Sequence, residues 1–178
     1  MNNSQESEDH SKKNDYQTIE QTMEKLSGGT RRLAAQLTTS ASFDSLWNVL
    51  TDYDRLNLYI PNLLSSKKIY QKNNNVHLKQ VGAQDFLGMK FSAEVTIDLF
   101  EDKELGLLKF SLIKGDFRKF EGSWKIQNIK DTSKNSLIYD LTVQGCQWMP
   151  IGMIEKRLKK DLSENLIAVD RQAKLSIN

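Results

Sequence analysis

The stretch KFSAEVTIDLF, residues 90–100, alternates between apolar and polar side chains along its length. One side of the stretch carries only the apolar residues Phe91, Ala93, Val95, Ile97 and Leu99. A period of two residues is typical of a β-strand with one buried and one solvated face. This segment therefore predicts a strand whose apolar side must be covered by another part of the protein.

The same alternation returns in the segments that follow. Apolar residues recur at every second position over residues 108–112, 120–126 and 137–143. Turn-forming residues cluster between these segments, at 101–106 and 131–136. Consecutive strands with such short connections pair as antiparallel hairpins. We expect six strands of this kind after the first helical segment, without a crossover helix between them.

A strand and two helices are expected before this series. Residues 31–39 are predicted to form a first strand, and Ser42 is placed to cap a helix that runs to about residue 52. A short second helix is expected between residues 54 and 60. It must end before Pro61, because the residue preceding a proline is disfavoured in helical geometry.

A long amphipathic helix is predicted from Pro150 onward. Its apolar positions are spaced three or four residues apart: Ile151, Ile154, Leu158, Leu162, Leu166 and Val169. No other predicted element is long enough to cover the apolar face of a sheet. The sequence therefore predicts an α+β fold in which a curved, seven-stranded antiparallel sheet wraps around this helix and leaves a hollow at its inner face.

Residues 1–29 differ in composition from the rest of the chain. They contain no apolar run, carry six acidic residues against three lysines, and end in Gly28 and Gly29. We expect a disordered tail over residues 1–29, with neither a secretory signal nor a transit peptide, followed by one domain over residues 30–178. No stretch is apolar enough to span a membrane.

Composition and charge limit the classes of function. The 178 residues are 38% hydrophobic, and 25 basic against 23 acidic residues leave a net charge of +2. This balance gives no indication of a nucleic-acid partner. Cys146 cannot form an internal disulfide, and with only His10 and His77 beside it no zinc ligand set exists. The cytoplasm is the expected compartment.

Three passages resemble the START-like (SRPBCC) superfamily, in particular its branch of coenzyme Q-binding START proteins and polyketide cyclase/dehydrase-like lipid carriers. They are SFDSLWNVLTDYDRLNLYIPNL (42–63), KGDFRKFEGSW (114–124) and PIGMIEKRLKKDLSENLIAV (150–169). The likeness extends over residues 31–172. It implies a helix-grip fold whose cavity holds an apolar small molecule. We expect no cofactor.

Candidate ligand-binding residues follow from this arrangement. They lie on the expected inner face of the sheet, on the facing side of the helix, or beside the loop at Pro61: Tyr59, Met89, Phe91, Val95, Phe110, Phe117, Trp124, Tyr139, Met149, Met153, Ile154 and Leu158. The family pattern matches at Phe117 and Trp124. For each residue, ordinary core packing is the alternative. Gln80, Arg118 and Gln144 are polar groups that could add selectivity.

The sequence contains no catalytic set. Asp52 and Asp54 form a close carboxylate pair without a partner histidine, and His77 stands alone in a predicted strand. The leading hypothesis is therefore a carrier of a hydrophobic small molecule such as a lipid, quinone, isoprenoid or polyketide-like compound. The alternatives are a cyclase or dehydratase acting on such a molecule, and an interaction protein that docks on a ribosome or membrane complex.

The sequence leaves membrane contact and the oligomeric state open. The basic residues between Lys156 and Lys160 are usually a solvated helix face, with transient contact to an anionic membrane as the alternative. The sequence gives no indication of the oligomeric state.

Overall fold

The computed structural model describes residues 19–86, 89–146 and 151–175, with side chains described throughout these ranges except at 84–91 and 151–154. The strands, in chain order, are β1 (Ile19–Lys25), β2 (Arg31–Thr39), β3 (Leu63–Lys72), β4 (Asn75–Phe86), β5 (Met89–Asp102), β6 (Leu107–Gly115), β7 (Phe117–Asn128) and β8 (Asn135–Gly145). They form one antiparallel sheet in the order β1-β2-β8-β7-β6-β5-β4-β3.

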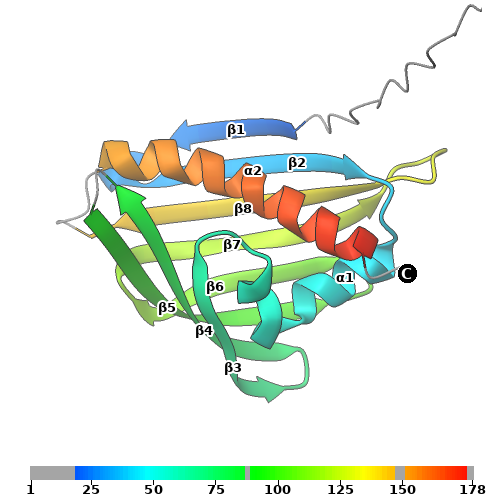
Figure 1. Ribbon diagram of the computed structural model, residues 1–178, viewed down its shortest axis with the longest axis horizontal. Helices are drawn as coiled ribbons and strands as arrows, with labels where there is room; N and C mark the ends of the chain where they lie inside the picture. Colours follow the sequence, from blue (N-terminus) through cyan, green and yellow to red (C-terminus); the bar gives the residue numbers. More distant parts are fainter. Residues whose placement is uncertain (1–18, 87–88, 147–150, 176–178) are drawn as a thin grey trace, which may run out of the picture.

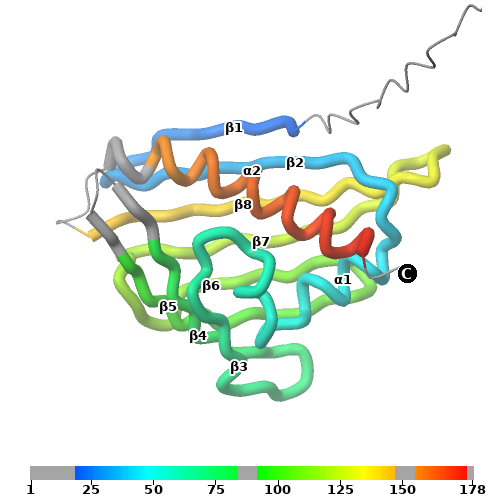
Figure 2. The backbone as a smooth tube through the Cα atoms, viewed as in Figure 1, coloured from blue at the N-terminus to red at the C-terminus, as the bar shows by residue number. Residues whose placement is uncertain are grey.

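Two α-helices and two short 3₁₀ segments complete the described chain. Helix α1 (Phe43–Thr51) and segment η2 (Tyr53–Leu58) connect β2 to β3, whereas η1 (Ser27–Gly29) lies between β1 and β2. Helix α2 (Ile151–Leu175) crosses in front of β2 and β8 (Figure 1). The backbone trace places β1 and β3 at opposite edges of the sheet (Figure 2). The predicted helix-grip fold is confirmed.

The core forms between the sheet and one face of α2. Leu162, Leu166, Val169 and Ala173 have at most 1% of their surface exposed, as their helical spacing requires. Every second residue of β8 from Leu137 to Val143 is buried as well. The two predicted periodicities therefore meet in one apolar layer.

The prediction of seven strands was wrong by one, because β1 arises from the segment expected to be a disordered tail. Its residues pair with β2 over the whole strand, from Ile19 opposite Leu37 to Lys25 opposite Arg31. Ile19 and Met23 also pack against the core. Gly28 adopts a left-handed conformation with φ of 64° and helps reverse the chain into β2. Backbone pairing with β2 thus orders a segment that its composition predicts to be disordered.

The second helix before Pro61 is shorter and tighter than an α-helix. Its 3₁₀ form ends at Leu58, and the side chain of Asp54 accepts a hydrogen bond from the backbone N–H of Lys68 at 2.8 Å. Asp52 lies 3.4 Å from Arg55. Both carboxylates therefore make local contacts where the chain enters β3.

Ser42 caps α1, as its position predicts. Its Oγ accepts a hydrogen bond from the backbone N–H of Ser45 at 3.1 Å. We expect Ser42→Ala to lower the free energy of unfolding by about 1 kcal/mol, because the N–H loses its partner. Urea unfolding followed by circular dichroism measures the change. Ser133→Ala, in an exposed turn, is the matched control, and an equal loss in both variants would contradict the assignment.

Candidate ligand-binding cavity

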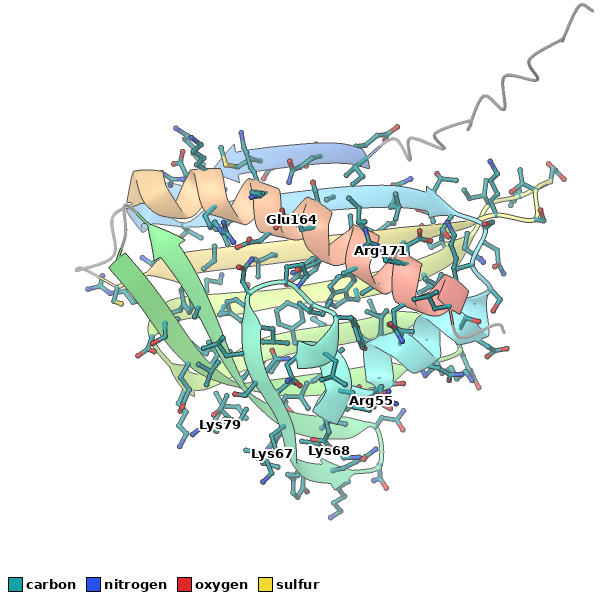
Figure 3. The ribbon with its side chains drawn as sticks, in the orientation of Figure 1. Arg55, Lys67, Lys68, Lys79, Glu164 and Arg171 are labelled. Carbon is teal, nitrogen blue, oxygen red and sulfur yellow. The ribbon has the colours of Figure 1, made fainter. Side chains whose placement is uncertain are left out.

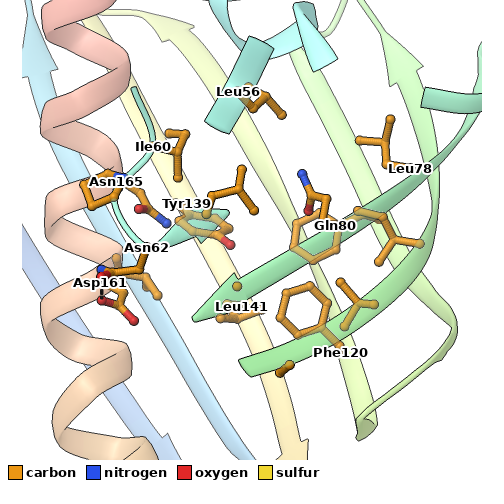
Figure 4. Close-up of a pocket in the computed structure, with 18 of the residues that line it drawn as sticks. Leu56, Ile60, Asn62, Leu78, Gln80, Phe120, Tyr139, Leu141, Asp161 and Asn165 are labelled. Carbon is orange, nitrogen blue, oxygen red and sulfur yellow. Dashed lines mark hydrogen bonds between the residues drawn. The ribbon is translucent and has the colours of Figure 1, made fainter. Parts of the chain in front are cut away.

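A cavity of about 350 Å³ lies between α2 and the inner face of the sheet. Strands β4 to β8, segment η2, the following loop and α2 all contribute to its walls (Figure 4). Most of the lining is aliphatic or aromatic. The apolar residues on the wall include Leu56, Ile60, Leu78, Val95, Ile97, Leu99, Leu108, Phe110, Phe117, Phe120, Trp124, Tyr139, Leu141, Leu158, Leu162 and Val169.

Irregularities in the sheet surround this hollow. The register shifts between Thr96 and Ile97 where β5 pairs with β6, and between Phe117 and Lys119 where β7 pairs with β8. Such bulges bend a strand and increase its local twist. Gly122 in β7 also lets the ring of Phe110 approach the backbone, since a Cβ at this position would lie 2.9 Å from Cζ of that ring. A bent sheet can enclose space that a flat one would leave open.

Six residues expected at the ligand site line the cavity: Val95, Phe110, Phe117, Trp124, Tyr139 and Leu158. The aromatic members form a continuous group. The rings of Trp124 and Tyr139 stack with centroids 4.0 Å apart, whereas Phe110 and Phe117 lie 5.6 and 5.5 Å from Phe120. Tyr139 and Trp124 are direct partners across β7 and β8. Strand pairing therefore places these rings together.

The other expected ligand residues do not contribute a described side chain to the cavity. Tyr59 is absent from its lining, and its hydroxyl donates a hydrogen bond to the carbonyl of Val49 at 2.5 Å. Met149 lies outside the described residues. The side chains expected at Met89, Phe91, Met153 and Ile154 also lie outside the described part of the structure.

One side of the cavity is polar. Arg157, Asp161 and Asn165 follow one another at intervals of four residues on α2, and all three line the cavity. Nε of Arg157 lies 3.0 Å from Oδ1 of Asp161, and Nδ2 of Asn62 donates to the same oxygen at 3.3 Å. We call Asn62, Arg157, Asp161 and Asn165 the polar wall (Figure 4).

The hydroxyl group of Tyr139 also belongs to the cavity. Burial raises the pKa of this phenol well above its usual value, and the negative charge of Asp161 raises it further. The hydroxyl therefore stays protonated at physiological pH and can donate a hydrogen bond. Gln80, on β4, lines the cavity too, and its Nε2 donates to Oγ of Ser66 at 3.1 Å.

The sequence analysis missed the polar wall, although it did propose Gln80, on β4, as a polar group at the site. The row formed by Arg157, Asp161 and Asn165 precedes the apolar row of Leu158, Leu162 and Leu166 by one position at each step. Charged residues beside an apolar stripe normally face solvent. The regular spacing of these three polar residues, each next to a residue of the apolar row, could have indicated that they border the cavity. Arg118 and Gln144 are not among the cavity-lining residues.

The possible catalytic residues lie away from the cavity. Asp52 and Asp54 are not part of its lining, and His77 lies 3.4 Å from Asp98 and packs its ring against Tyr70. Within the ranges 19–86, 89–146 and 151–175, no cluster of three or more His, Cys, Asp or Glu residues could hold a metal ion.

The charged groups at the surface largely pair with one another. On α2, Lys160 lies 3.5 Å from Glu164, and Arg157 is paired with Asp161. These contacts reduce the basic character expected between Lys156 and Lys160. Further cations, including Arg55 and Lys67, project from η2 and β3 (Figure 3).

None of the described helices is long and apolar enough to cross a membrane.

The antiparallel sheet closed around one long helix, with an internal cavity, defines a protein of the START-like helix-grip class. A sequence model of the family described as polyketide cyclase / dehydrase and lipid transport matches residues 39–170. The chain therefore belongs to this family. No curated protein sequence matches the chain.

Solved structures with the same fold have very different sequences. The Zhui aromatase/cyclase from a Streptomyces species is 15% identical, with a TM-score of 0.71 over 84% of this chain and 96% of that protein. A STAR-related lipid transfer protein from Xanthomonas axonopodis is 12% identical, with a TM-score of 0.74 over 88% and 93% of the two chains. Human StAR-related lipid transfer protein 5 is 6% identical, with a TM-score of 0.72 over 90% and 84%.

Proposed function

We propose that this protein binds and carries a hydrophobic small molecule in the cavity beneath α2. The observation that supports this proposal most directly is the open volume of about 350 Å³ between two apolar layers that could otherwise have packed together. This volume lies within the range of about 300–1,000 Å³ that is usual for small-molecule sites. The family description, which includes lipid transport, agrees with this function.

Burial of the ligand would provide the main free energy of binding. Removing about 300 Å² of apolar ligand surface from water yields roughly 7 kcal/mol before the costs of association are subtracted. Aromatic residues such as Phe110 and Trp124 supply much of the complementary surface. Micromolar affinity is therefore attainable without a strong polar contact.

Native mass spectrometry tests the carrier function. Protein purified from its own host without detergent is expected to show a reproducible mass increase that disappears after extraction with organic solvent. The extract then identifies the compound. Repeated recovery of protein without any bound apolar molecule, together with no binding of added lipids, quinones or isoprenoids, would contradict the proposal.

A cyclase or dehydratase activity on such a molecule is the second candidate. The family description and the cavity position of the Tyr139 hydroxyl favour it, because a protonated phenol can donate a hydrogen bond to a developing oxyanion. Fold alone does not decide between carriage and chemistry. Turnover of a polyketide-like substrate that falls in Tyr139→Phe, while binding persists, would favour the enzyme.

Docking on a ribosome or membrane complex is less well supported. A protein that acts only through its outer surface does not need an open interior, whereas this chain retains one beside the packed core of Leu162 and Leu166. Any membrane contact would serve to load the ligand.

A further inference from the structure

We propose that the ligand carries a hydroxyl group, which donates a hydrogen bond to Oδ1 of Asn165 and accepts one from the hydroxyl of Tyr139. This inference rests on the proposed function and adds the chemical class of the ligand, an uncharged alcohol or phenol with an apolar body. It is carried by two polar groups in the mostly apolar lining of the cavity, one on α2 and one on β8.

Asn165 supplies the acceptor. Its Oδ1 is buried and has no hydrogen-bond partner among the described residues, although the side chain lines the cavity. A buried acceptor without a partner is costly, and most such groups in folded proteins are satisfied. A ligand that donates a hydrogen bond at this point would remove that cost.

The neighbouring acceptor on α2 already has contacts. Oδ1 of Asp161 accepts from Asn62 and lies beside the guanidinium of Arg157. Within the polar wall, Oδ1 of Asn165 is the buried acceptor that has no partner among the described residues. It lies one helical turn beyond Asp161, on the same side of α2.

Tyr139 supplies the donor. Tyr139, on β8, lines the same cavity as Asp161 and Asn165 on α2 (Figure 4), and the negative charge of Asp161 acts on its phenol. Burial and this negative charge both keep the hydroxyl protonated. The site therefore offers one acceptor and one donor.

A hydroxyl group matches this pair better than other common polar groups. It donates and accepts at once, whereas a ketone or ether only accepts and leaves Asn165 unsatisfied. A carboxylate likewise only accepts and could not donate a hydrogen bond to Asn165. The apolar body of the ligand would then extend along Phe110, Phe117 and Trp124.

A matched pair of probes tests the inference. Displacement of the fluorescent dye Nile red by 1-decanol and by its methyl ether compares ligands that differ in the ability to donate a hydrogen bond. We expect the alcohol to bind about tenfold more tightly to the wild type, the ratio of one net hydrogen bond. Asn165→Leu should abolish this preference and leave the affinity for the ether within about twofold.

Two further variants make the result specific. Tyr139→Phe should weaken binding of the alcohol and of the ether by similar factors, because both oxygens accept from the phenol, whereas Asn128→Leu, at an exposed site, should change neither. Equal binding of both probes to the wild type, or an unchanged preference in Asn165→Leu, would overturn the hydroxyl inference and leave the carrier function intact. If neither probe displaces the dye, both proposals fail for this class of ligand.

Discussion

Replacing Ala93 with tryptophan is expected to abolish ligand binding while the protein stays folded. Ala93 lies on β5 opposite Gly82 and lines the cavity. An indole at this position would occupy the space that the ligand needs. Losing contact with about 120 Å² of ligand surface corresponds to roughly 3 kcal/mol, or about a hundredfold in affinity. Titration with Nile red, together with a thermal unfolding curve, measures both properties.

The matched control places the same side chain on the outer face of the sheet. Ser111, on β6, is exposed and lies outside the cavity lining, so Ser111→Trp should bind the dye as the wild type does. Tight binding by Ala93→Trp with its fold intact would show that the ligand binds elsewhere.

Gly122→Ala is expected to cause the largest loss of stability among the substitutions considered. A Cβ atom at this position would lie 2.1 Å from the carbonyl oxygen of Asp140 and 2.9 Å from the ring of Phe110. The ring can move, but the carbonyl belongs to the paired strand β8. We expect the free energy of unfolding to fall by about 2–3 kcal/mol, as measured by urea unfolding.

Gly82→Ala tests whether the effect is steric. This glycine also lies within a strand, but an added Cβ would meet only the carbonyl oxygen of Asn62, at an ordinary contact distance of 3.5 Å. Its stability should stay within about 0.5 kcal/mol of the wild type. Similar losses in both variants would indicate a general effect of glycine replacement in strands.

The fold was predictable because two periodicities dominate the sequence. The alternation in β5 and the three- and four-residue spacing in α2 each define one apolar face, and packing the helix on the sheet buries both faces. The buried positions Ile97, Leu162 and Val169 follow that pattern directly. Aromatic cavity residues such as Trp124 could be proposed for the same reason.

The remaining features depend on contacts that a single sequence does not display. Strand β1 is ordered by backbone pairing with β2, and its mostly polar side chains do not predict this pairing. The role of Asn165 depends on how α2 rotates against the sheet, which brings a residue beside the apolar stripe into the cavity. The bulges in β6 and β7, which bend the sheet around the cavity, are likewise not visible in the alternating pattern.

The pairing of β1 with β2 has a consequence for where the domain can be cut. The family match starts at residue 39, the last residue of β2, and a fragment beginning at residue 30 would retain β2 without its outer neighbour. The backbone N–H and C=O groups on one side of β2 would then have no partner. Such an exposed edge can pair with the edge of another molecule. An expression fragment should therefore keep the chain from Ile19 onward.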